Sequence, residues 1–122
     1  MRDDVADLLL AADAARLSDH PAEAVPYLNQ VVRAHGSDPR ASLASFTLGR
    51  VLLDELGRPV EAATAFENAR KGPLAEDALA REVEAWSRGG DTTRARNLAI
   101  EYETAYPQGR RSRAVAKFGG LE

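Results

Sequence analysis

Cysteine is absent from the 122 residues, so the chain has neither a disulfide framework nor a thiolate metal site. No apolar run approaches the roughly 20 residues of a membrane-spanning helix. The first residues, M-R-D-D-V-A-D, lack the basic and then apolar order of a signal peptide. An excess of one charge is also missing, because 16 Lys and Arg face 19 Asp and Glu, a net charge of −3. We therefore expect no direct membrane insertion and no general nucleic-acid binding.

Catalytic motifs are missing as well. The two histidines, His20 and His35, stand outside any H-E-x-x-H or H-x-x-H pattern. The chain has no G-x-S-x-G elbow, no phosphate-binding glycine loop and no dinucleotide-binding fingerprint. We accordingly expect no enzymatic activity, no cofactor and no metal. Four carboxylates near helix faces are interpreted as solvated: Asp54, Glu55, Glu82 and Glu84.

The chain does contain a clear helical hairpin between Ser45 and Lys71. Its first half has apolar residues on one helical stripe, namely Leu48, Val51 and Leu52. Gly57 then ends that helix, and Pro59 suits the first turn of the next. The second half repeats the helical spacing with Ala62, Ala65, Phe66 and Ala69. The segment therefore predicts two antiparallel helices with one buried seam.

Imperfect copies of this hairpin lie on both sides of it. The spacing of Gly57, Ala62, Phe66 and Ala69 recurs in Gly90, Ala95, Ala99 and Tyr102, and in Asp19, Ala24, Leu28 and Val31. The anchors Ala24, Ala62 and Ala95 lie 38 and 33 residues apart. A repeat near this length predicts a stack of helical hairpins, in which these three alanines are buried.

The second copy contains Leu48-Gly49, Gly57, Ala62, Phe66 and Ala69, and the third contains Trp86, Gly90, Ala95 and Pro107. In these residues the chain resembles the tetratricopeptide repeat (TPR) family. The resemblance covers about residues 5–107. It departs from the family pattern in three places: the interval from Gly49 to Gly57 is one residue too long, Glu82 replaces a leucine, and in the first copy Ala11, Ala12 and Ala15 replace the leucine, glycine and aromatic residue of the first helix. It implies an all-α, right-handed superhelical stack of three hairpins and a role as a protein-binding scaffold.

One domain, residues 1–118, is expected. Its repeats are about 5–38, 39–72 and 73–107, and a short helix at 110–118 caps the end of the stack. Proline, glycine and capping residues predict helices at about 5–17, 21–35, 40–56, 59–71, 74–88, 91–105 and 112–118. Asp38 is the expected cap of the third helix, and Pro26 is expected to disturb the second. Residues 119–122 resemble a linker followed by a cloning scar.

By the same resemblance, the first helix of each hairpin would line a concave groove for an extended peptide or an amphipathic helix of a partner. The residues carried over are Leu9, Asp13, Arg16, Leu17, Leu43, Phe46, Arg50, Leu53, Asp77, Arg81, Glu84 and Arg88. The family's carboxylate clamp needs lysines and asparagines, whereas this chain has Leu9, Asp13 and Thr47, and only Arg81 matches. An amphipathic segment therefore suits the groove better. The alternative, that neighbouring helices cover Leu43, Phe46 and Leu53, is equally open.

Two further surfaces are considered. Residues 104–121 carry four cations and no acid, so Arg110, Arg111, Arg113 and Lys117 form either a solvated tail helix or a basic contact for an acidic partner. An open end of a three-hairpin stack would also allow self-association as a homo-oligomer. The turn Tyr106-Pro107-Gln108-Gly109 resembles bacterial repeats of cell-envelope assembly and signalling proteins, which favours an extracytoplasmic setting slightly over a cytoplasmic one.

Overall fold

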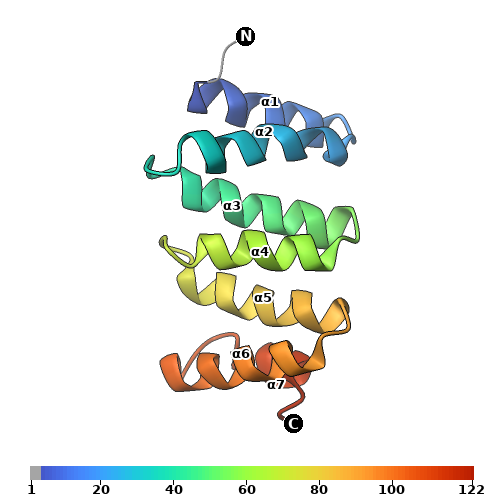
Figure 1. The fold of residues 1–122 in the computed structure, drawn as a ribbon, viewed down its shortest axis with the longest axis vertical. Helices are drawn as coiled ribbons and strands as arrows, with labels where there is room; N and C mark the ends of the chain where they lie inside the picture. Colours follow the sequence, from blue (N-terminus) through green and yellow to red (C-terminus); the bar gives the residue numbers. More distant parts are fainter. Residues whose placement is uncertain (1–3) are drawn as a thin grey trace.

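The computed structural model describes residues 4–122, which form helices joined by turns, with no β-strand among them. The elements are α1 (Val5–Leu17), α2 (Pro21–Ala34), α3 (Ala41–Arg50), the π-helical turn η1 (Val51–Glu55), α4 (Pro59–Ala69), α5 (Ala75–Arg88), α6 (Thr92–Ala105) and α7 (Ser112–Gly119). Figure 1 shows α1 to α6 running back and forth in one stack, in chain order, with the C-terminus at the opposite end from α1. Each helix packs on the next, and α7 packs on both α5 and α6.

The predicted helix ends are confirmed to within two residues. The Asp4 carboxylate accepts a hydrogen bond from the backbone N–H of Ala6 at 2.7 Å and so caps α1. The prediction for Asp38 was wrong, because α3 begins only at Ala41. The Asp38 carboxylate instead closes the preceding turn by accepting from the backbone N–H of Arg40 at 2.8 Å.

Proline inside the second helix does not end it. Pro26 lies within α2, which continues to Ala34 and remains one helix on both sides of the proline. The side chain of Pro26 is exposed, so its ring points away from the packed face of the helix.

The three hairpin turns adopt the same unusual backbone conformation. The φ angles are 64° at Asp19, 63° at Gly57 and 88° at Gly90, all in the left-handed region. Glycine enters this region without a steric penalty, and aspartate is one of the few other residues found there. The alignment of Asp19 with the two glycines, made from sequence spacing alone, is therefore confirmed in the backbone.

The small-residue seam is buried as predicted. Ala24, Ala62 and Ala95 are all within 1% of complete burial. The core has two clusters, one spanning α1 to α4 together with Ala85 of α5, and one joining α5, α6 and α7. Trp86 packs against both, so it lies where the third hairpin joins the first two.

The additional residue between Gly49 and Gly57 is absorbed by η1. Here the backbone N–H of Leu56 bonds to the carbonyl of Val51 at 3.0 Å, five residues back rather than four. Such a turn accommodates one more residue than an α-helix does. Gly49 lies just before it, and a Cβ there would come within 2.6 Å of the Phe66 ring. Glycine therefore allows Phe66 of α4 to pack directly on the α3 backbone.

Candidate partner-binding face

The face predicted to bind a partner is formed by α1, α3 with η1, and α5, and we call it the first-helix face. Three of its predicted residues, Leu9, Asp13 and Leu43, line one shallow hollow of about 170 Å³. Thr47, which stands at a clamp position of the second copy, also lines this hollow, together with Arg40. The structure thus brings together residues of the first two hairpins that were predicted separately.

The aromatic part of this face is half-buried. Phe46 packs edge-on against Phe66, with ring centroids 5.5 Å apart, and remains partly exposed. Leu43 is 43% exposed and is available to a partner. Leu53 is only 4% exposed, so of the two alternatives left open, cover by neighbouring helices holds for Leu53. The π-helical turn accounts for this, because it buries Val51, Leu52 and Leu53 in succession.

The third-hairpin part of the face is a row of ion pairs. Arg81 pairs with Asp54 of the second hairpin and with Glu84 at 2.6 Å, and Arg88 pairs with Glu84 at 2.7 Å. The prediction that Glu84 is solvated was wrong, since only 7% of this residue is exposed. Because Arg81 already has two carboxylate partners, it is not free to bind the carboxylate of a peptide.

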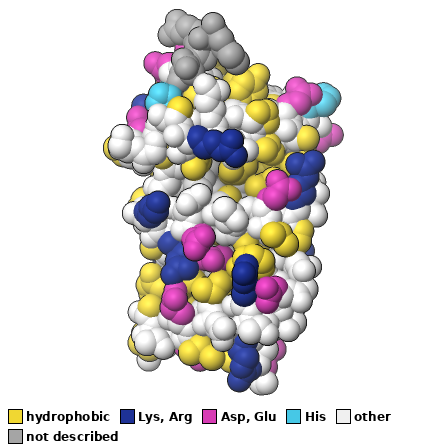
Figure 2. All heavy atoms as spheres, in the orientation of Figure 1, with side chains coloured by type: hydrophobic (Ala, Val, Ile, Leu, Met, Phe, Trp, Pro, Cys, Tyr) yellow, Lys and Arg dark blue, Asp and Glu magenta, His cyan; other side chains and the backbone are white. Residues whose placement is uncertain are grey.

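The ion pairs continue towards α1. The Nε atom of Arg16 lies 3.5 Å from Oε2 of Glu55 and is buried without a hydrogen-bond acceptor. This links the first hairpin to η1. The exposed residues Asp13 and Arg50 add one charge of each sign to the same face. Figure 2, which shows one side of the molecule, has Lys and Arg next to Asp and Glu, with no large patch of a single sign.

Asp77, predicted for the groove, is instead bound by the C-terminal segment. Its carboxylate accepts from Nε of Arg111 at 2.9 Å and from Nη2 of Arg110 at 3.2 Å. Although burial raises the pKa of Asp77, the hydrogen bonds from Arg111 and Arg110 hold it below its ordinary value. Two of the four predicted basic residues thus attach the C-terminal segment to α5. Of the others, Arg113 is exposed and Lys117 lies 5.7 Å from the Phe118 ring centroid.

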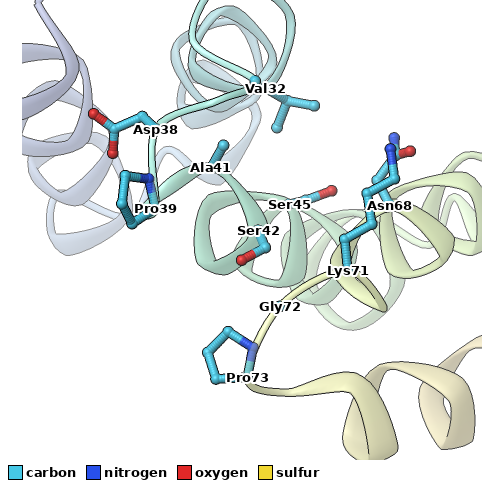
Figure 3. Close-up of a pocket in the computed structure, with 11 residues that line it drawn as sticks. Val32, Asp38, Pro39, Ala41, Ser42, Ser45, Asn68, Lys71, Gly72 and Pro73 are labelled. Atoms are coloured by element: carbon cyan, nitrogen blue, oxygen red, sulfur yellow. The ribbon is translucent and has the colours of Figure 1, made fainter.

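A larger hollow, of about 550 Å³, lies outside the predicted site, at the turns between hairpins. Figure 3 shows Asp38 and Pro39 on one side of it and Asn68 and Lys71 on the other. The Asp38 carboxylate is engaged by Arg40, whose side-chain hydrogen bond lowers the pKa of Asp38 to about 2. Apart from Lys71 the hollow therefore presents no free charge, and we interpret it as space left where two hairpin junctions meet.

A site that sequence reasoning missed lies between α4, α5 and α6. Glu82, interpreted as solvated, is only 4% exposed, and that interpretation was wrong. Its Oε1 accepts from Nη1 of Arg70 at 3.1 Å, and Arg70 also pairs with Glu101. Burial raises the pKa of Glu82 to about 7 against the opposing effect of Arg70. The one sequence signal was the presence of Glu82 where the family pattern has leucine.

No protein-family model, curated protein or solved structure matches this chain. Residues 4–122 contain no cluster of three His, Cys, Asp or Glu side chains suited to a metal ion. Over the same residues, no helix has the length and apolarity needed to cross a membrane. The function must therefore be argued from the geometry of the first-helix face and of the helix stack.

Proposed function

We propose that this chain is an interaction module whose first-helix face binds an amphipathic segment of another protein, and that its hairpins form a right-handed TPR-like stack. The observation that carries the proposal is the shared hollow of Leu9, Asp13 and Leu43, which joins α1 to α3. The common turn conformation at Asp19, Gly57 and Gly90 supports the repeat arrangement. Repeat stacks of this kind offer extended binding surfaces.

The chemistry of the face favours an amphipathic helix over a peptide held by its terminal carboxylate. Leu43 and the half-buried Phe46 offer apolar contact, while Asp13 and Arg50 flank them with opposite charges. An amphipathic helix binds by placing its apolar stripe in a hollow of this sort, with polar residues at the edges. A carboxylate clamp would instead need unpaired cations, and Arg81 is already bound by Asp54 and Glu84.

Replacing Leu43 by Asp tests this proposal. Ile100→Asp is the matched control, because Ile100 is 46% exposed and lies on α6, away from the first-helix face. Proteins captured from the source organism by the wild type should be lost with Leu43→Asp and kept with Ile100→Asp, at unchanged thermal stability. Capture that is equally strong with both variants would contradict the proposal.

Self-association is a second candidate, favoured by the outer side of α1. Leu10 is 69% exposed and Leu17 is 89% exposed, and both lie on the terminal helix of the stack. Leu17 was predicted to line the groove, but it lies two turns after Leu10 on the same side of α1 and does not line the hollow of Leu9 and Asp13. Terminal repeats normally present a polar outer face, so an apolar one suits contact with another stack. Sedimentation velocity separates the candidates. A mass that rises with concentration, and no longer does so after Leu10→Glu and Leu17→Glu, would favour self-association.

A further inference from the structure

The missed site is a pocket of about 390 Å³ between α4, α5 and α6. Its walls include Glu82 and Trp86 from α5, Glu67 from α4, and Arg94 and Leu98 from α6. Glu82 and Trp86 are one helical turn apart, so a carboxylate and an indole ring border the same space. This pocket is built by the second and third hairpins and shares no residue with the hollow on the first-helix face.

The charges around the pocket are unbalanced towards negative. Arg70 is shared between Glu82 and Glu101, so the buried carboxylate has only part of one guanidinium as its counter-ion. Glu67 adds another negative charge at the pocket wall. Both Glu67 and Glu101 act on Glu82 to raise its pKa further, in addition to burial. A second cation next to Glu82 would relieve this repulsion, since an opposite charge nearby favours the ionised carboxylate.

The indole ring already accommodates a cation. The guanidinium of Arg94 lies 4.6 Å from the Trp86 ring centroid, within the range of a cation–π interaction. The Arg94 side chain is 62% exposed and is otherwise paired only loosely, at 3.5 Å, with Asp91. Because Arg94 is so exposed, an incoming guanidinium can take its place over the ring at small cost.

We propose that this pocket binds an alkylguanidinium or alkylammonium group, with Glu82 as its ion-pair partner and Trp86 as the ring on which it stacks. The methylene stem of such a group would lie against Leu98. A planar guanidinium fits best, because it can bond to a carboxylate edge-on while its face lies against an aromatic ring. Two sources present this chemistry, an arginine or lysine side chain of a partner protein and a free small cation.

Trp86 is the only tryptophan in the chain, so its fluorescence reports on this pocket alone. The probes are n-butylguanidinium and its neutral isostere n-butylurea. We expect a saturable change in emission with the cation and none with the urea. Glu82→Gln keeps the shape of the side chain and removes its charge, so it should weaken binding of the cation by about tenfold or more. Glu103→Gln, at an exposed position of α6, should leave binding unchanged.

Equal responses to n-butylurea and n-butylguanidinium, or wild-type affinity in a folded Glu82→Gln, would overturn the proposal. If Glu82→Gln fails to fold, Glu67→Gln replaces it, and unchanged affinity there would count equally against the proposal. N-acetylarginine N-methylamide separates the two sources. Binding as tight as that of n-butylguanidinium supports a protein side chain, and markedly weaker binding supports a free small cation.

Discussion

Asp19 adopts a backbone conformation that suits glycine better than a residue with a side chain. Its φ of 64° lies in a region where a side chain costs energy, and the two equivalent turns use glycine. The aspartate still forms the turn, since Asp tolerates this region better than most residues. The first hairpin thus keeps the geometry of the others with some backbone strain.

Asp19→Gly should therefore raise the free energy of unfolding by about 0.5 kcal/mol, because relief of strain exceeds the entropy added to the unfolded chain. The control is Asp13→Gly, also at an exposed aspartate but within α1, which should lower it by about 0.3 kcal/mol, the difference in helix propensity between Asp and Gly. Urea denaturation followed by circular dichroism measures both. Two losses of similar size would show that the left-handed turn carries no strain.

Glu82 makes stability depend on pH. Its pKa is about 7 in the folded protein against an ordinary 4.5, so the folded state holds this proton more tightly than the unfolded chain. The contribution of Glu82 to the free energy of unfolding thus falls as pH rises from about 4.5 to 7, and stays low above that range. The cause is burial with only a shared counter-ion, Arg70.

Glu82→Gln should remove this pH dependence. The free energy of unfolding of the variant minus that of the wild type should rise by on the order of 2 kcal/mol from pH 4.5 to pH 8, because of the raised pKa of Glu82. Urea denaturation of both proteins at the two pH values provides the comparison. A difference between them that does not change with pH would mean that Glu82 titrates normally.

Among the elements, the π-helical turn η1 explains how an irregular repeat keeps a regular seam. It takes up the additional residue so that Gly57 and Ala62 still reach their equivalent positions. The same turn buries Leu53, which the resemblance to the repeat family had placed in the groove. An insertion in a helix can therefore be read from repeat spacing, but its effect on which side chains are exposed cannot.

Deleting Asp54 should convert η1 into an ordinary α-helical turn with the fold retained. Glu55 would then take the place of Asp54 beside Arg81 and leave Arg16, so only two partly exposed ion pairs are exchanged, at a cost of about 1 kcal/mol. Deleting Asn97 from the middle of α6 is the control, because it rotates Ala99 and Tyr102 out of the core. Thermal melts should show a small decrease for the first deletion and loss of cooperative unfolding for the second. Similar losses in both would contradict the role given to η1.

Features that depend on residues close together in the sequence were predicted, whereas features that depend on contacts between distant segments were not. Helix ends depend on local signals such as Gly57 and Pro59, and these were predicted from the sequence. The anchors of the seam followed from the repeat spacing. The state of Glu82 depends on Arg70, which reaches it from the preceding hairpin, and nothing adjacent to Glu82 in the chain indicates that pairing.

The same reasoning applies to the candidate site. The resemblance predicted that the first helices of neighbouring hairpins line one face. Leu9, Asp13 and Leu43 do line one hollow there. Asp77 is removed from that face by arginines 33 and 34 residues later, a pairing that depends on how the C-terminal segment returns to α5. Ion pairs between segments distant in the sequence thus decide which predicted groove residues are free to contact a partner. Repeat spacing gives no information on these ion pairs.

For the whole molecule, the two ends of the stack differ. At the C-terminal end, α7 covers α5 and α6, and Arg110 and Arg111 attach that segment through Asp77. At the other end, α1 exposes Leu10 and Leu17. The first-helix face runs between these ends and combines exposed apolar residues with charges of both signs. This face supports the proposed interaction module with a partner bound along the stack, whereas the exposed side of α1 supports the alternative, self-association.

Site-specific photo-crosslinking tests that claim most directly. A benzophenone amino acid is placed at Leu9 or Leu43 on the first-helix face and, as controls, at Val60 or Ile100, which are exposed apolar positions on α4 and α6. We predict that positions 9 and 43 yield the same adduct with another protein in cells of the source organism and that positions 60 and 100 do not. Adducts that are equally strong from 60 and 100, or that join only two copies of this chain, would contradict the account.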